Sequence, residues 1–203
     1  MIDTALMLEQ CSRMYPKGLT AQQAEGLAKL LRSMEDDDLL LTWRAYKLAT
    51  VKHECANTWQ PITERGPRTY FNKYETGTKI GRALGNTQPG DGFLFRGRGY
   101  VQLTGRANYE KMTVAVGSLM VPSVDYVANP DLLLTHEHAY AVMAAGMLTG
   151  AFTGKSIRTY VPGPIGGTPD YVNARRVING LDCAEKIAGY AREFEEMLTA
   201  ARR

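Results

Sequence analysis

The stretch that decides the fold runs from Phe93 to Tyr109 and reads FLFRGRGYVQLTGRANY. Apolar and polar residues alternate only weakly over 93–104, which predicts a short irregular hairpin. The stretch overlaps the segment Gly77–Gly105, in which eight of 29 residues are glycine and Pro-Gly-Asp-Gly at 89–92 marks a turn. The sequence therefore predicts one irregular, glycine-rich region.

Helical patterns flank this region on both sides. Thr20 and Gln23 form a capping-box pattern ahead of leucines at helical spacing. The acidic run Glu35–Asp38 is expected to start the next helix, which should end near Asn57. Helical spacing returns over residues 106–116, 136–149, 171–178 and 183–201, with a loop over 161–169. The predicted fold class is therefore mainly α, with a small irregular Gly-rich hairpin region.

Length and composition describe an ordinary globular chain. The 203 residues are 44% hydrophobic and 22% charged, which argues against a disordered or fibrous protein. We expect a single catalytic domain over 1–203, with N-terminal helices over 1–57, a cleft and Gly-rich loops over 58–105, and C-terminal helices over 106–203. The net charge of +3 is too small to indicate nucleic-acid binding.

Cysteine usage and the N-terminus bear on the compartment. Cys11, Cys55 and Cys183 are odd in number and widely spaced, so a disulfide framework is not expected and a reducing compartment is favoured. The opening MIDTALMLEQCSR lacks a basic start followed by an apolar run, so no secretory signal is predicted. The apolar stretch 139–148 is too short to span a bilayer and is expected to be a core helix.

Several short motifs resemble known binding signatures, but each lacks a residue that the signature requires. The Gly97–Gln102 run lacks the last glycine of a dinucleotide fingerprint, and Gly150–Ser156 is one residue short of a phosphate loop. His53-Glu54 begins a zinc signature, but Asn57 stands where the second histidine must be. The sequence therefore predicts no nucleotide cofactor and no metal site.

Two carboxylates are candidates for acid–base chemistry. Glu54 lies near the end of an apolar helix, where the helix dipole and burial would both raise a carboxyl pKa, as a general acid needs. Glu64 lies in the turn-rich Pro61–Gly66 segment beside Arg65, which would keep it ionised. Glu75 is a third candidate, and spacing alone does not choose between Glu64 and Glu75. The plain alternatives are a solvated helix end for Glu54 and a surface ion pair for Glu64.

Four segments resemble glycoside hydrolase family 19. They are KHEC at 52–55, ITERG at 62–66, FRGRGYVQLTGRANY at 95–109 and VINGL at 177–181. The likeness covers most of residues 40–200 and is greatest to the short, single-domain phage endolysins that are often labelled chitinase-like. It implies a lysozyme-like two-lobed helical fold, no cofactor, and hydrolysis of a β-1,4-linked polymer that contains N-acetylhexosamine.

The resemblance also implies residue roles. Glu54 matches the general acid, and Glu64, in its Glu-Arg-Gly context, matches the base that activates water. Thr104 would help to hold that water. The positions that resemble sugar-binding residues are Gln102, Asn108 and Asn179. A family arginine beside the base is matched here by Lys186, a departure that leaves the role of this position open.

The chemistry of an inverting hydrolase is compatible with these residues. Its two carboxyl groups stand roughly 6.5–9.5 Å apart, with room for water, and a helix end with a facing loop can supply that gap. Tyr100 and Tyr109 suit a sugar-binding surface and, equally, the core. The expected role for most of the arginines Arg96, Arg98, Arg175 and Arg176 is an ion pair.

We therefore expect an endolysin-type hydrolase that cleaves peptidoglycan for bacterial cell lysis. It would act as a monomer without inserting in a membrane. It would be held in the cytoplasm of the producing cell until a separate pore-forming protein releases it. Chitin is the alternative substrate within this class. A non-catalytic cell-wall-binding module is the alternative of another class, and the presence of both Glu54 and Glu64 weighs against it.

Overall fold

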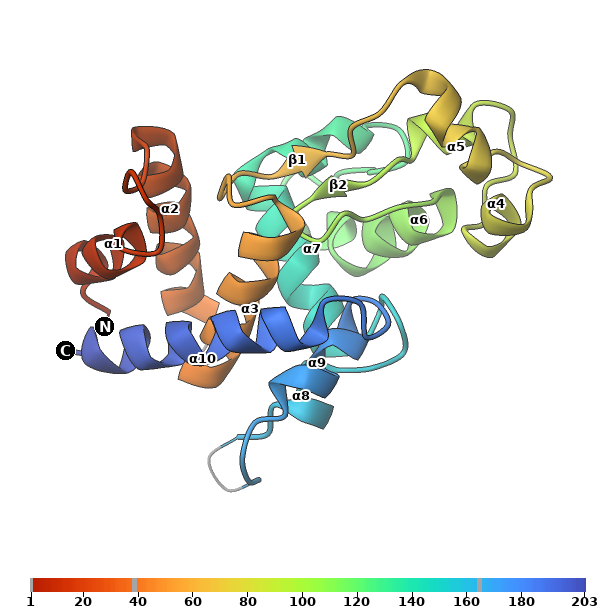
Figure 1. The fold of residues 1–203 in the computed structure, drawn as a ribbon. Coiled ribbons are helices and arrows are strands. Elements are labelled where there is room, and N and C mark those ends of the chain that lie inside the picture. The colour runs from red at the N-terminus through yellow and green to blue at the C-terminus, as the bar shows by residue number, and fades with distance from the viewer. Residues whose placement is uncertain (1, 38–39, 164–165) are drawn as a thin grey trace. The chain divides into compact units, whose positions relative to one another are not determined.

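The fold is mainly α, as the sequence predicts. The computed structural model describes residues 2–37, 40–163 and 166–203 (Figure 1). Within these ranges the one sheet is an antiparallel pair of short strands, β1 (Ile62–Thr63) and β2 (Arg98–Gly99). Across the same ranges, none of the helices has the length and apolar character that a bilayer crossing requires.

The chain divides into two compact units, Met1–Gln60 with Met147–Arg203, and Pro61–Gly146. The first holds α1 (Thr4–Ser12), α2 (Ala21–Asp37), α3 (Leu41–Glu54), α8 (Ile157–Tyr160), α9 (Tyr171–Ala174), the 3-10 helix η4 (Arg175–Val177) and α10 (Ala184–Ala200). The second holds β1, β2, the 3-10 helices η1 (Arg68–Tyr74), η2 (Gly117–Leu119) and η3 (Pro130–Leu134), and the helices α4 (Lys79–Ala83), α5 (Asp91–Leu94) and α6 (Arg106–Ala115). The division falls near the end of α7 (His136–Thr149).

The first unit is built on α3 and α10, which pack across each other (Figure 1). Apolar residues recur along α10 at helical spacing, and six of them are buried: Ala184, Ile187, Ala188, Ala191, Phe194 and Leu198. Trp59 packs edge-on against Phe194, with ring centroids 5.8 Å apart. The chain ends meet where the Asp3 amide donates to the Ala201 carbonyl at 2.8 Å. This packing fixes α3, the helix that ends in Glu54.

The start of α2 follows the sequence prediction. The Thr20 amide donates to Gln23 Oε1 at 2.8 Å, and the Gln23 amide donates to Thr20 Oγ1 at 3.2 Å. Each side chain thus satisfies a backbone donor that the helix leaves without an acceptor. The capping box is confirmed.

The prediction for the acidic run is wrong. Residues 35–37 end α2 instead of starting α3, which begins at Leu41; Asp38 and Leu39 lie outside the described residues. Glu35 accepts a hydrogen bond from the Ile2 amide at 2.5 Å, a tertiary contact that offsets the unfavourable helix dipole. The end of α3 also comes earlier than predicted, at Glu54, because Ala56 and Asn57 adopt positive φ.

In the second unit the glycine-rich region forms an irregular hairpin. Arg98 and Leu103 exchange backbone hydrogen bonds of 3.2 and 2.9 Å across a turn in which Gly99 and Gln102 have positive φ. The region differs from the prediction at its start, because residues 91–94 form α5. It also differs in its partner, because β2 pairs with β1 from a distant part of the chain.

The predicted helices after this region are present. They form α6 (Arg106–Ala115), α7 (His136–Thr149), α9 continued by η4, and α10. The apolar stretch 139–148 lies in α7 and contributes the buried residues Ala139, Tyr140, Val142, Met143 and Met147. The expectation of a core helix there is confirmed.

Candidate active site

Glu54, the predicted acid, forms an ion pair in the first unit. Its Oε1 lies 2.5 Å from Nη1 of Arg175, and the side chains are 15% and 3% exposed, respectively. Arg175 Nε also donates to the backbone carbonyl of Asp182 at 3.0 Å. A guanidinium held at two points fixes the direction of the carboxyl group, because charge-assisted bonds of this kind are strong and directional.

Local structure explains why Arg175 and not Arg176 meets the carboxylate. Asp170 caps α9 by accepting from the Asn173 amide at 3.0 Å, and the chain then tightens into η4. This turn buries Arg175 and leaves Arg176 exposed, where its Nε donates to Asn173 Oδ1 at 3.0 Å. The sequence predicts ion pairs for most of the arginines and does not distinguish Arg175 from the others.

Glu54 shares one face of α3 with Tyr46 and Thr50, which precede it by two turns and one turn. The Tyr46 ring stacks on Tyr171 with centroids 6.1 Å apart, and both rings are buried. Burial raises the pKa of the Tyr46 hydroxyl far above its ordinary value, against the opposing effect of the Arg175 charge. Tyr46 and Thr50 thus form a buried surface that leads along α3 to Glu54.

A buried lysine holds the turn that follows Glu54. Lys52 Nζ donates to Asn57 Oδ1 at 2.8 Å and to the Tyr15 hydroxyl at 3.1 Å. Trp59 Nε1 donates to the same hydroxyl at 2.8 Å. Burial lowers the pKa of Lys52. Of the residues in this hydrogen-bond network, only Asn57 indicates a turn from the sequence, because asparagine is a residue type that tolerates positive φ.

Glu64, the predicted base, follows β1 in the second unit. Its Oε1 accepts from the Tyr74 hydroxyl at 3.0 Å and its Oε2 accepts from the Gly97 amide at 3.2 Å. The Glu64 amide in turn donates to the Gly97 carbonyl at 2.7 Å. Burial, followed by smaller effects that include the Glu64 charge, raises the pKa of Tyr74, so this phenol stays a donor to the carboxylate. No motif in the sequence indicates this role of Tyr74.

Gly97 is the point around which three predicted site residues gather. A Cβ there would lie 2.9 Å from Gln102 Oε1 and 3.3 Å from both Glu64 Cβ and Thr104 Oγ1. Any side chain would displace these groups. Glycine at this position therefore lets the carboxylate, the hydroxyl and the amide approach one another.

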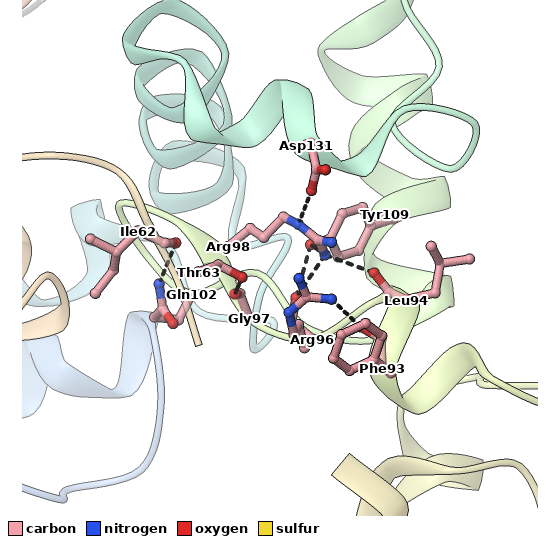
Figure 2. Close-up of polar contacts among 10 residues, drawn as sticks. All are labelled: Ile62, Thr63, Phe93, Leu94, Arg96, Gly97, Arg98, Gln102, Tyr109 and Asp131. Atoms are coloured by element: carbon pink, nitrogen blue, oxygen red, sulfur yellow. Dashed lines mark hydrogen bonds and ion pairs between the residues drawn. The ribbon is translucent and has the colours of Figure 1, made fainter. Parts of the chain in front are cut away.

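Gln102 and Thr104 are ordered by the backbone around them. Gln102 Nε2 donates to the carbonyls of Ile62 and Gly99, at 3.1 Å each, and Figure 2 shows the first of these bonds. Thr104 Oγ1 donates to the Gln102 carbonyl at 2.9 Å, which leaves its lone pairs available to accept. Gln102 thus shapes the hairpin with its amino group.

The remaining amide candidates lie in different units. Asn108 Nδ2 donates to the Thr104 carbonyl at 2.7 Å, and so supports the loop that carries Thr104. Asn179 belongs to the first unit, where it is exposed and its Oδ1 accepts from the Gly180 amide at 2.9 Å. Its backbone amide donates to the Arg175 carbonyl at 3.0 Å, which places it close to the Glu54–Arg175 pair in the chain fold.

The two tyrosines of the glycine-rich stretch are core residues. Tyr100 is 1% exposed and its hydroxyl bonds His136 Nδ1 at 2.8 Å. Tyr109 donates to the Arg96 carbonyl at 3.0 Å and accepts from Arg98 at 3.2 Å (Figure 2). Burial raises the pKa of Tyr109 to about 12. The packing alternative therefore fits both better than direct contact with a sugar.

In the part of the chain that the structure describes, neither Glu75 nor Lys186 forms a hydrogen bond or ion pair with Glu54 or Glu64. Glu75 Oε2 accepts from the Gly90 amide at 2.8 Å and so anchors a loop. Lys186 lies on α10 with Nζ 6.0 Å from the centre of the Tyr190 ring. Arg175, and not Lys186, pairs with a predicted catalytic carboxylate, and that carboxylate is the predicted acid Glu54.

Replacing Arg175 with Met is expected to destabilise the fold by roughly 3–5 kcal/mol, because it leaves the partly buried Glu54 charge without its partner. The matched control is Arg13→Met, which removes an exposed pair with Glu9 and should cost at most about 1 kcal/mol. Urea unfolding of both variants gives the comparison. Equal losses in the two would show that the buried pair contributes no more than a surface one.

A pH effect is expected at His53. Burial lowers the pKa of His53 below its ordinary value of 6.5, so the unfolded chain binds this proton at higher pH than the folded chain. The free energy of unfolding should therefore fall as the pH drops through about 6.5, and this part of the slope should vanish in His53→Gln. Unfolding curves at about pH 7.5 and about pH 5.5 measure it. An unchanged slope in the variant would assign the effect to other groups.

Metal ligands and relatives give no further assignment. Within the described ranges, no group of three or more His, Cys, Asp or Glu side chains is placed to hold a metal ion. Among the described residues, Cys11, Cys55 and Cys183 form no disulfide. No protein-family model matches this chain, and no curated protein matches it significantly.

Proposed function

We propose that this protein is an endolysin-type glycoside hydrolase that cleaves β-1,4 bonds of peptidoglycan, with Glu54 as general acid and Glu64 as general base. The observation that carries the proposal is that each carboxyl group is held by ordered donors. Arg175 holds Glu54, and Tyr74 with the Gly97 amide holds Glu64. Ordered carboxyl groups are what acid–base catalysis needs. Arg175 supports the orientation of Glu54 and favours its ionised form, so Glu54 must take up a proton before each turnover.

The chemistry divides between the two groups. Glu64 takes a proton from a water molecule, whose oxygen attacks the anomeric carbon, while Glu54 gives its proton to the leaving glycosidic oxygen. The C–O bond to the leaving sugar breaks as the new C–O bond forms, so the configuration inverts. Thr104 supports this assignment, because its hydroxyl lies beside Gly97 with lone pairs that can accept from the water.

Arg175 has a role in the same step. When Glu54 has given up its proton, a negative charge remains in a side chain that is only 15% exposed. The guanidinium at 2.5 Å offsets that charge as it develops, and it also holds the carboxyl group in one orientation. In this proposal the protein accumulates in the cytoplasm of the producing cell, and a separate pore-forming protein releases it to the wall.

A turbidity assay on permeabilised bacteria tests the proposal. The wild type should clear the suspension, and Glu54→Gln should bind the cells without clearing them. Chitin oligosaccharides form a parallel arm. Cleavage of chitin alone would replace the substrate, and wall binding without clearing by the wild type would favour the non-catalytic module.

A further inference from the structure

Positive charge is concentrated in one part of the second unit. Residues 64–106 contain eight Lys or Arg and three Asp or Glu, a net charge of +5 compared with +3 for the whole chain. The three acids are engaged in the local structure. Glu64 bonds Tyr74 and Gly97, Glu75 anchors the Gly90 amide, and Asp91 pairs with Arg106 at 2.6 Å.

Most of the basic residues in this segment keep their charge uncompensated. Arg98 pairs with Asp131 at 2.7 Å, and Arg106 pairs with Asp91. Among the residues that the structure describes, the other six form no ion pair: Arg65, Arg68, Lys73, Lys79, Arg82 and Arg96. This local excess of positive charge creates a field that attracts anions.

Two of these guanidinium groups are held against one aromatic ring. The Arg68 and Arg96 guanidinium carbons lie 4.6 and 4.0 Å from the centre of the Phe93 ring. Arg96 Nη1 also donates to the Phe93 carbonyl at 2.7 Å, as Figure 2 shows. Burial, with the nearby Arg98 and Arg68 charges, lowers the pKa of Arg96. The Phe93 ring thus holds both positively charged groups within 4.6 Å of its centre.

In the sequence, three of these positively charged residues are next to Glu64 or to a residue that hydrogen-bonds to it. Arg65 follows Glu64 directly, Lys73 precedes Tyr74, and Arg96 precedes Gly97. Lys73 Nζ lies 3.5 Å from the centre of the Tyr70 ring and 4.6 Å from that of Tyr74. We define the basic patch as Arg65, Arg68, Lys73 and Arg96.

We propose that the basic patch binds carboxylates carried by the glycan, so that the substrate is acidic, peptide-bearing peptidoglycan and not neutral chitin. The inference rests on the proposed function and names its substrate class. The stem peptides of peptidoglycan carry free carboxylates, whereas the N-acetylglucosamine units of chitin carry no charge. A planar guanidinium matches a carboxylate with two parallel hydrogen bonds, and the two guanidinium groups held at Phe93 provide two such sites.

Binding is tested without turnover by placing all variants in a Glu54→Gln background. Purified peptidoglycan is used before and after carbodiimide amidation of its carboxyl groups, with chitin as the neutral polymer, over a range of NaCl concentrations. The double variant Arg68→Gln/Arg96→Gln should bind untreated peptidoglycan about tenfold more weakly, with a shallower dependence on salt. On amidated peptidoglycan and on chitin, the double variant should bind with the same affinity as the protein whose basic patch is unsubstituted.

The matched control is Lys79→Gln/Arg82→Gln, which removes the same charge from α4, outside the basic patch. An equal loss in the control would reduce the effect to net charge and overturn the proposal. If the basic patch binds wall teichoic acid or DNA more tightly than peptidoglycan, the proposal that it recognises the carboxylates of peptidoglycan is wrong. Arg65→Gln, at an exposed position, should show the smaller effect of one charge even if the double variant folds poorly.

Turnover by the wild type separates this inference from the proposed function. A wild type that binds through the basic patch but cleaves nothing would contradict the hydrolase and support the binding. For the second comparison, Arg68→Gln/Arg96→Gln is made with Glu54 intact. If the wild type cleaves peptidoglycan and this variant has the same KM, the hydrolase proposal stands and the binding role of the basic patch is contradicted. The expected result is a raised KM on peptidoglycan with kcat largely retained.

Discussion

Glu54→Gln is expected to lower kcat about 10²–10⁴-fold while the chain stays folded. The amide oxygen of the new side chain can still accept from Arg175, so the local geometry is kept. The amide has no proton of comparable acidity to give to the leaving oxygen, so the bond-breaking step loses its acid. Initial rates on solubilised peptidoglycan, with melting curves for each protein, measure the effect.

The matched control for this change is Glu9→Gln, because Glu9 pairs with Arg13 on the surface at 2.6 Å and lies far from the proposed chemistry in sequence. It should leave kcat unchanged. Arg175 is left charged with a neutral partner in the Glu54 variant, so some loss of Tm is expected there and assays must be run well below it. A folded Glu54→Gln protein with wild-type kcat would remove Glu54 from the mechanism.

Glu64→Gln is expected to lower kcat by a similar factor, about 10²–10⁴-fold, with little change in KM. Water activation matters only in the transition state, whereas binding of the sugar does not depend on the charge of Glu64. The Tyr74 hydroxyl can rotate to accept from the new amide, so the fold should persist. Azide is expected to restore part of the rate to Glu64→Ala by replacing the activated water.

Glu75→Gln is the control for Glu64. Its carboxylate accepts from the Gly90 amide, so its loss should change stability and not the chemical step. An amide oxygen can keep that bond, and the expected cost is about 1 kcal/mol or less. An inactive, folded Glu75→Gln beside an active, folded Glu64→Gln would reverse the assignment of the base.

Local signals in the sequence were sufficient for much of the fold. The Thr20–Gln23 capping box and the helices α7 and α10 depend on neighbours within a few residues, and these agree with the prediction. Elements that depend on distant partners were not predictable in this way. The two-residue strand β1 pairs with β2 across more than thirty residues, and neither strand is long enough to show a repeating pattern.

The candidate site, like the fold, combines residues that a local pattern identifies with residues that only tertiary packing brings together. Glu64 directly follows β1, and Gln102 and Thr104 follow β2. The resemblance identified all three, and they share one place around Gly97. Arg175 meets Glu54 from 121 positions away, and Tyr74 meets Glu64 from ten. Such pairs arise from tertiary packing, which neither composition nor periodicity reveals.

The acidic run at the end of α2 shows how a sound local rule can fail. Negative charge suits a helix N-terminus, and the sequence places Glu35 close to the next helix. Instead, Glu35 lies at the end of α2, where its carboxylate accepts a hydrogen bond from the Ile2 amide, 33 positions earlier in the chain. One tertiary hydrogen bond of about 1 kcal/mol is enough to offset a dipole effect of similar size.

Mass spectrometry of the products from purified peptidoglycan tests the central claim most directly. The wild type should generate new reducing-end sugars, and Glu54→Gln should generate none. A reducing-end N-acetylmuramic acid would identify a muramidase, and a reducing-end N-acetylglucosamine would identify a glucosaminidase. Intact glycan strands after treatment with the folded wild type, or release of stem peptides without a new reducing end, would contradict the account.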